Sequence, residues 1–118
     1  AQVGRTMIFN AMLDFFTDFD VLALPVVGNM PHPQSEEWVR KVGGQTLSGY
    51  MDWLRFNFLA TTAGLPAMSV PVGIGPRGMP VGLQLIGKPR GEAGLLAAAR
   101  FVEMAMGGPL APIDPIMG

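Results

Sequence analysis

The chain has 118 residues, of which 49% are hydrophobic and 14% are charged, and its formal net charge is −1 at pH 7. This length predicts a single domain over residues 1–118 with one hydrophobic core, and the hydrophobic content excludes intrinsic disorder. Nearly balanced charge without a cluster of Lys and Arg argues against a nucleic-acid partner, and the lack of cysteine excludes disulfides and thiolate chemistry.

The first third of the chain predicts a helix, a strand and a loop, in that order. The spacing of apolar residues in 5–18 is typical of an amphipathic helix. Its apolar stripe comprises Ile8, Ala11, Met12, Phe15, Phe16 and Phe19. The continuous apolar run 21–24, stopped by a proline, predicts a strand buried on both faces. A loop is expected at 28–34, followed by a short capped helix that begins at 35–37 and is broken at 43–44.

Residues 47–63 predict one helix that is apolar on more than one side. One face carries Leu47, Tyr50, Met51, Leu54 and Phe58, and a second carries Trp53, Phe56 and Ala60. A helix with two apolar faces is usually buried between layers. Gly64 is a typical C-terminal stop, and Pro66 prevents the helix from continuing because it lacks an N–H.

The second half predicts a hairpin followed by a helix. Strands are expected at 67–72 and 81–86, joined by the glycine- and proline-rich connection 73–80. An alanine-rich helix is expected over 91–105, before a tail, 110–118, that is too rich in proline for regular structure. Gly82 lies inside a strand, which predicts close approach of another backbone or of a packed helix.

Three residue patterns suggest chemistry, and each has a structural explanation that fits better. Gly73, Gly75 and Gly78 match the dinucleotide fingerprint, but a strand follows them instead of the required helix. His32 is the only histidine, and metal sites commonly need several ligands. Ser69 and Lys88 could form a Ser–Lys pair, although nothing in the sequence places them together. We therefore expect no cofactor, no metal site and no catalytic residue.

Several motifs resemble those of a known enzyme family. The sequence TAGLPAMSVPVG, followed by GMPVGLQLIGKPRGEAGLLAAA, resembles the C-terminal signature of the amidase signature family, the serine hydrolases that cleave carboxamides. FDVLALP at 19–25 is similar to an upstream strand of that family, and YMDWL at 50–54 to a helix entry of its acetamidase-like members. The resemblance implies an α/β fold, with a small mixed sheet flanked by helices, from the C-terminal portion of the amidase signature fold.

The family's catalytic residues have no match in these motifs. Family members use a nucleophilic serine and a bridging serine in a Gly/Ser-rich segment, with a lysine upstream. The serines here are Ser35, Ser48 and Ser69, and none lies in such a segment. Two hypotheses follow. The chain is a non-catalytic, self-associating domain derived from an amidase, or it is one subunit or fragment of a split amidase completed by a chain with the catalytic segment.

The resemblance also points to a substrate pocket. In the family, the stretch before Gly-Leu-Pro helps to wall the substrate cleft, which makes Tyr50, Trp53, Asn57 and Thr61 the pocket candidates. Many members read FTxPANLAGLP there, whereas Asn57, Leu59 and Thr61 take the Thr, Pro and Asn places in this chain. The alternative for the aromatic pair is ordinary packing, with the Tyr O–H or Trp N–H bonded locally.

Composition predicts that the chain associates with another chain. Its 14% charged residues compare with about 25% in a typical globular domain. Loss of the family's larger portion would leave an open strand edge and bare apolar faces. We expect a homodimer, or a complex with a complementary amidase chain, through the helix 47–63 and the N-terminal helix near Phe15 and Phe16. Without a membrane span or signal pattern in these residues, a cytoplasmic location is expected and a membrane partner is not.

Overall fold

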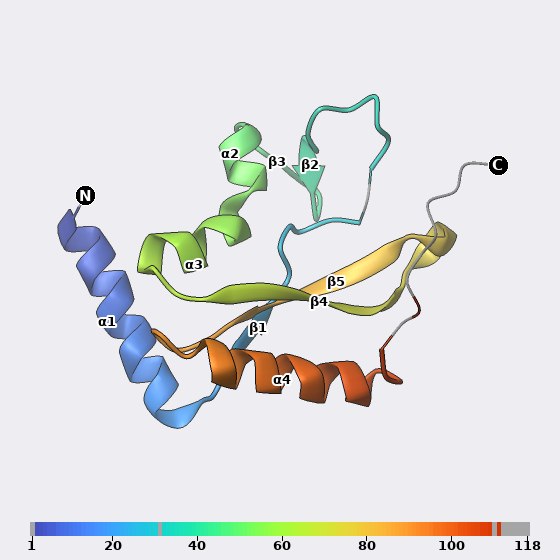
Figure 1. Cartoon of the computed structure of the whole chain (residues 1–118). Helices are drawn as coiled ribbons and strands as arrows, with labels where there is room; N and C mark the ends of the chain where they lie inside the picture. The colour runs from blue at the N-terminus through green and yellow to red at the C-terminus, as the bar shows by residue number, and fades with distance from the viewer. Residues whose placement is uncertain (1, 31, 110, 112–118) are drawn as a thin grey trace.

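The computed structural model describes residues 2–30, 32–109 and 111, and Figure 1 shows its course. Its elements are α1 (Gln2–Asp18), β1 (Leu22–Leu24), β2 (Lys41–Val42), β3 (Gln45–Thr46), α2 (Tyr50–Trp53), η1 (Arg55–Asn57), α3 (Phe58–Ala63), β4 (Ala67–Ile74), η2 (Pro76–Gly78), β5 (Pro80–Ile86) and α4 (Glu92–Ala105). Apart from Ala111, the expected irregular tail lies outside the described residues. None of the helices described has the length and apolar character needed to cross a membrane.

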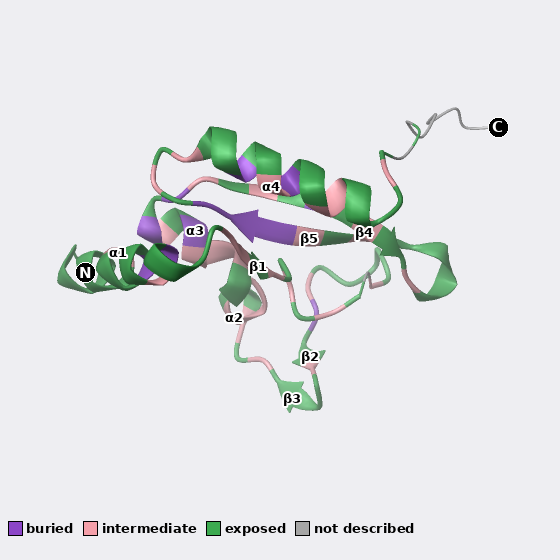
Figure 2. Ribbon diagram, turned by 90° about the horizontal axis from the view of Figure 1, so that it is seen from below, coloured by how far each residue is buried: buried purple, intermediate pink, exposed green. Residues whose placement is uncertain are grey.

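A three-stranded sheet in the order β1-β5-β4 forms the centre of the molecule. Helix α4 covers one face, while α1 and α3 lie on the other face, so the sheet stands between two helical layers (Figure 2). The predicted α/β class, with a small sheet flanked by helices, is confirmed. Both strand pairings are antiparallel, whereas a mixed sheet was expected. The antiparallel direction follows from the connection, because β4 and β5 are joined by a short turn.

Two clusters of buried side chains hold the layers together, one on each face. Successive side chains in a strand point to opposite faces, and Leu85 and Ile86 of β5 have exposed fractions of 1% and 0%. On the α4 side, the buried residues are Val70, Leu85, Leu95 and Ala99. On the α1 and α3 side, they are Met12, Phe16, Ala60, Ala63, Leu65 and Ile86. β5 therefore contributes to both clusters.

The helix predicted over 47–63 is broken into three short segments. Gly49 is extended, and Leu54 leaves the helical conformation with φ −89° and ψ 15° between α2 and η1. The break has a packing reason. Trp53 of α2 contacts the loop before β2, whereas Ala60 and Ala63 of α3 are buried against α1. One straight helix could not present its side chains to both neighbours.

Two further predictions before this helix are corrected. Residues 34–35 form a turn where a short helix was expected, and the Glu36 N–H donates to Pro33 O at 3.0 Å. Gly43 and Gly44, expected to break that helix, instead turn the β2–β3 hairpin with φ of 57° and 82°. Two central residues with positive φ are typical of a tight hairpin turn, and Gly-Gly is a known signal for it.

The strand predicted at 21–24 is an edge strand, and Ala23 is exposed on it. It was expected to be buried on both faces, as a central strand would be. The sheet ends at β1 within the described part of the chain, where Leu22 and Leu24 pack against the cluster under α1 and α3 while Ala23, on the other face, is not covered.

The end of α3 follows the prediction from Gly64 and Pro66. Gly64 adopts the left-handed conformation, with φ 69° and ψ 38°, and its N–H donates to Thr61 O at 3.2 Å. The Leu65 N–H reaches back to Ala60 O at 2.9 Å, and the Leu65 side chain is buried. This is the pattern of a Schellman cap, which satisfies the last carbonyls of the helix.

Gly82 is in a tight environment, but its neighbour differs from the expected one. A Cβ built on Gly82 would lie 2.8 Å from Ser69 Oγ and 3.9 Å from Val70 O. The close atom is therefore a serine hydroxyl on the neighbouring strand, not a backbone or a helix. A serine side chain can rotate, so the loss of stability caused by a larger residue at position 82 depends on whether the Ser69 hydroxyl can move aside.

We predict that Gly82→Ala destabilises the chain by about 1 kcal/mol, since the new methyl group displaces the Ser69 hydroxyl. In a Ser69→Ala background the same change should cost little, and Gly82→Val should cost more than Gly82→Ala in either background. A double-mutant cycle by urea denaturation measures the coupling. Gly94→Ala in α4 is the control for coupling: nothing lies within 4 Å of its Cβ position, so its effect on stability should be the same in both backgrounds. Equal costs in both backgrounds would contradict the contact.

Candidate functional site

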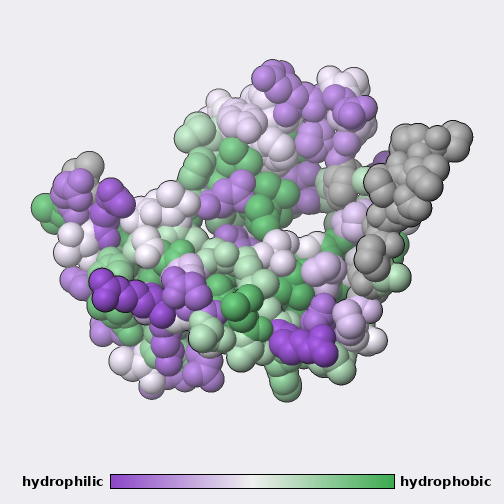
Figure 3. All heavy atoms as spheres, viewed as in Figure 1, coloured by the Kyte–Doolittle hydropathy of each residue, from purple (hydrophilic) through white to green (hydrophobic). Residues whose placement is uncertain are grey.

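Trp53 lies between two cavities, which makes it the centre of the candidate site. The first cavity, of about 200 Å³, lies between the β2–β3 hairpin and the α2–η1 segment. The second, of about 310 Å³, lies between the loop 27–32 and the start of β5. Both include Trp53 in their walls. In Figure 3 a hollow separates the polar upper part of the molecule from the more apolar body below it.

Hydrogen bonding and aromatic contacts fix the Trp53 ring in this position. Its indole Nε1–H donates to Asn29 Oδ1 at 2.7 Å, across 24 residues of sequence. The rings of His32 and Tyr50 meet it edge to face, with centroid distances of 5.3 and 5.6 Å. His32 is held by its Nε2, which lies 3.1 Å from Glu36 O. The aromatic surface is therefore anchored at its polar end and presents its apolar body to the cavities.

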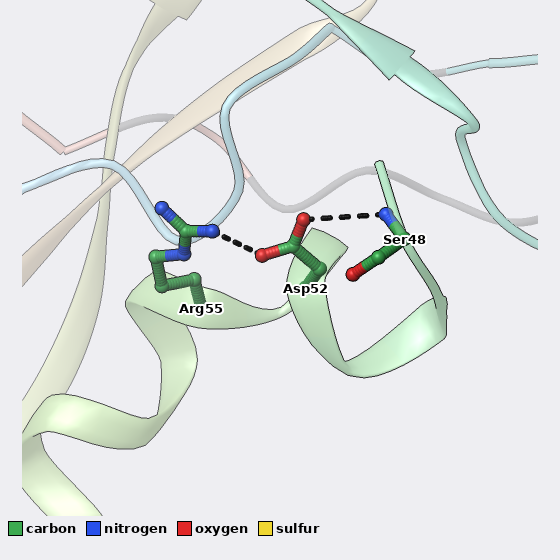
Figure 4. Close-up of polar contacts among 3 residues, drawn as sticks. All are labelled: Ser48, Asp52 and Arg55. Carbon is green, nitrogen blue, oxygen red and sulfur yellow. Dashed lines mark hydrogen bonds and ion pairs between the residues drawn. The ribbon is translucent and has the colours of Figure 1, made fainter. Parts of the chain in front are cut away.

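The rim of the first cavity carries an ion pair. Arg55 donates from a guanidinium nitrogen to Asp52 Oδ1, and the Ser48 N–H donates to Asp52 Oδ2 at 3.4 Å (Figure 4). The hydrogen bond from Arg55 lowers the pKa of the Asp52 carboxyl below its ordinary value of 3.8, although desolvation opposes this. Asp52 is thus an anion at neutral pH, and its charge is already satisfied.

The four predicted pocket residues are only partly brought together. Tyr50 and Trp53 are in contact, and Trp53 lines both cavities. Asn57 lies on η1, where its buried Oδ1 has no hydrogen-bond donor among the described residues. Thr61 is exposed on α3 and lines neither cavity.

Sequence reasoning missed residues that the fold brings to this site from far along the chain. Asn29 and His32 come from the loop before β2, and Val81 and Gly82 come from β5. His32 was interpreted as a loop residue without a role, yet its ring contacts Trp53. In the sequence, His32 lies between two prolines, which indicate a turn but do not indicate which side chain His32 contacts. The side-chain amide of Gln84 in β5 donates to Phe56 O at 3.4 Å, which links η1 to the sheet.

Ser69 and Lys88 lie apart, so they do not form a catalytic pair. Ser69 is opposite Gln84 in the β4–β5 register, and Lys88 follows the end of β5. Lys88 Nζ lies instead 3.8 Å from Asp20 Oδ1. Within the described ranges, no group of three His, Asp or Glu side chains is arranged to hold a metal ion. What the site offers is an aromatic surface at Trp53 between two cavities, of which the first is about equally polar and apolar and the second is mostly apolar.

The sequence matches the family described as Amidase over residues 1–96. It is 38% identical to a fatty acid amide hydrolase of Arabidopsis thaliana over 103 residues, which cover 87% of this chain and 17% of that protein. It is 39% identical to one subunit of the glutamyl-tRNA(Gln) amidotransferase of Gluconobacter oxydans (strain 621H) over 105 residues, covering 89% and 20%. The chain therefore spans about a fifth of the length of these relatives.

Solved structures give the same result for the fold. A bacterial aryl acylamidase of the amidase signature enzymes superimposes with a TM-score of 0.76 at 27% identity, covering 92% of this chain and 25% of that one. A 6-aminohexanoate cyclic dimer hydrolase superimposes with a TM-score of 0.66 at 25% identity, covering 87% and 23%. The arrangement of α1 to α4 around the small sheet thus recurs as one portion of much larger chains.

The Asp52–Arg55 pair predicts how stability depends on pH. Because the folded pKa of Asp52 is lowered, its contribution is fully present above about pH 4 and is lost as the pH falls through the folded pKa. Asp52→Asn should therefore lower the melting temperature at pH 7, and the difference from the parent chain should shrink toward pH 2. Thermal unfolding followed by circular dichroism measures this, with Asp14→Asn as the exposed control. A constant difference from pH 7 to 2 would contradict the ion pair.

Proposed function

The chain belongs to the amidase signature family, and from this premise we propose that it forms a non-catalytic part of a carboxamide hydrolase. The observation that carries the proposal is a family fold without the family's nucleophile. The serines of these 118 residues lie outside any Gly/Ser-rich run, and Ser69 has no lysine beside it. The covalent route to amide hydrolysis has no first step without an activated nucleophile. That step would come from a segment carrying the two serines and the lysine, in the same polypeptide or in another chain.

In this proposal the chain supplies one wall of the substrate cleft. Trp53 and Tyr50 provide the apolar aromatic surface, and Met30 and Val27 extend it within the second cavity. Asn57 lies on η1 between the two aromatic residues and α3, and its Oδ1 is buried without a hydrogen-bond donor among the described residues. Thr61, exposed on α3, would face the complementary segment. Such a wall favours carboxamides with an apolar acyl or amine group.

Self-association is the second candidate role, and the surface area supports it. The chain exposes 8567 Å², whereas a folded monomer of this mass exposes about 6,200 Å². Its radius of gyration is 16.5 Å, compared with about 13.5 Å for a compact domain of this length. Large apolar side chains account for part of the excess, including Val3, Met7, Leu96 and Phe101, which are 60% to 76% exposed.

The contact residues named for self-association need a correction. Phe16 is 5% exposed and lies inside the cluster under α1, and Phe15 is partly buried against the same cluster. Ala60 and Ala63 of α3 are buried there too, whereas Tyr50, Met51 and Phe56 of the 47–63 segment are 47%, 64% and 41% exposed and stay contact candidates. A contact surface has to be sought among the exposed apolar residues.

The proposal predicts that the isolated chain hydrolyses no simple amide or ester, because it has no activated nucleophile. Adding an amidase segment that carries the Gly/Ser-rich run and the lysine should restore turnover of an apolar carboxamide such as benzamide. Turnover is followed by ammonia release, and nucleophile labelling by a fluorophosphonate probe. Turnover by the chain alone together with labelling of Ser69 would overturn the proposal.

The two tryptophans give a matched test of the cleft wall. In the completed enzyme, Trp53→Ala should raise KM for benzamide about tenfold, the equivalent of about 1.4 kcal/mol of lost contact. Trp38→Ala is the control, because Trp38 contacts Arg40 in a cation–π pair and lines neither cavity. An unchanged KM in both variants would remove Trp53 from the cleft.

A further inference from the structure

We infer that Asn29 is a positioning residue for the candidate cleft: its side-chain amide sets where the Trp53 indole lies between the two cavities. The inference deepens the proposed function and rests on it, since it assigns the placement of the aromatic wall to one residue. Asn29 takes no part in the chemical step and acts only through Trp53. Its removal should therefore change substrate binding and leave the rate of the chemical step as it is.

The helix that carries Trp53 is too short to fix the position of that side chain. α2 has four residues, none of them is buried, and Gly49 before it supplies no side-chain cap. A single helical turn is not stable without tertiary contacts. The bonds that Asp52 receives from Ser48 and Arg55 are local, because these partners lie four and three positions away. In Figure 1, α2 stands apart from the central sheet, so the placement of Trp53 has to come from a residue outside the helix.

The Asn29 amide is held in one orientation by its two hydrogen-bond partners. The Trp53 indole N–H donates to Asn29 Oδ1 at 2.7 Å, and the Asn29 Nδ2–H donates to Met30 O at 2.5 Å. An indole N–H can only donate, and a backbone carbonyl can only accept. The reversed amide would place donor against donor and acceptor against acceptor, and both bonds would be lost together. Asn29 therefore presents its acceptor to Trp53 in a single direction.

The backbone on both sides of Asn29 is packed against other elements. A Cβ built on Gly28 would lie 3.1 Å from Val42 Cγ1, so the Gly28 backbone closely approaches β2. On the other side, the terminal methyl group of Met30 lies against Gly75, where a Cβ would otherwise stand. Gly75 follows the end of β4. Asn29 is thus anchored to two strands, and it passes that anchorage to Trp53.

The position of the indole decides the shape of the cleft wall. Trp53 is the residue that the linings of the two cavities share, and Asn29 lines the second of them. The edge-to-face contacts with His32 and Tyr50 restrict the ring, but a hydrogen bond is more directional. Rotation of the indole away from Asn29 would enlarge one cavity and fill part of the other. The wall that a substrate meets therefore depends on the Asn29 acceptor.

The contact itself can be read by nuclear magnetic resonance, because the chain has two tryptophans. With ¹⁵N-labelled indole groups, the Trp53 N–H should be shifted by its bond and protected from exchange with solvent. Asn29→Leu should remove both effects and leave the Trp38 signal unchanged, and Trp38→Ala assigns the two signals. Asn10→Leu, at an exposed position of α1, is the matched control and should change neither signal. An unchanged Trp53 signal in Asn29→Leu would overturn the inference.

A double-mutant cycle in the completed enzyme separates positioning from a general structural role. Asn29→Leu and Trp53→Phe each remove one side of the hydrogen bond. Each should raise KM for benzamide about fivefold with kcat unchanged, which corresponds to one ordinary hydrogen bond. Because Asn29 acts through the Trp53 N–H, the double variant should have the same KM as either single variant. Effects that multiply, or a fall in kcat at constant KM as loss of folded enzyme would give, would overturn the inference.

The same series distinguishes this inference from the proposed function. If Trp53→Ala leaves KM for benzamide unchanged, the aromatic wall is wrong and the role of Asn29 falls with it. If Trp53→Ala raises KM and Asn29→Leu does not, the wall stands and Asn29 does not position it. Failure of the completed enzyme to turn over benzamide would count against the hydrolase role alone, since the indole signals still decide whether Asn29 holds Trp53.

Discussion

The burial of both faces of β5 is the constraint on which the rest of the structure depends. Leu85 and Ile86 are adjacent in sequence and point into different clusters, one under α4 and one under α1 and α3. β5 is also the strand with a neighbour on each side, since β1 and β4 both pair with it. The same strand supplies Val81 and Gly82 to the cavity beside Trp53. The position of the candidate site therefore follows from the packing of the core.

Local signals in the sequence were enough to predict the elements that β5 organises. The two hairpin strands and the alanine-rich helix each show the apolar spacing of their secondary structure within their own residues. Gly64 ends α3 because glycine readily adopts a positive φ. The break at Leu54 could not be read in this way, because the pattern of 47–63 is helical throughout. It arises from contacts with two different partners, the loop at Asn29 and helix α1.

The sequence could group only those residues around Trp53 that lie near it along the chain, for a related reason. Tyr50 and Trp53 are three positions apart, so that a short helix suffices to bring them together. Asn29 and His32 reach Trp53 only because the chain between them and α2 folds back through the β2–β3 hairpin. The Gly43–Gly44 turn of that hairpin was interpreted as a helix break, and the proximity it creates was missed with it. The resemblance of YMDWL to an amidase helix entry pointed to the segment with Tyr50 and Trp53, whose role in a substrate pocket stays a prediction.

The shortness of β1 has a consequence for how far the sheet can grow. A sheet with two long open edges can add strands at both ends, which is the route to fibres. Here the edge opposite β4 offers three residues, Leu22 to Leu24, immediately followed by Pro25. A strand of this length, ended by a proline, offers few backbone N–H and C=O groups to a further strand, so growth of the sheet from the β1 edge is disfavoured.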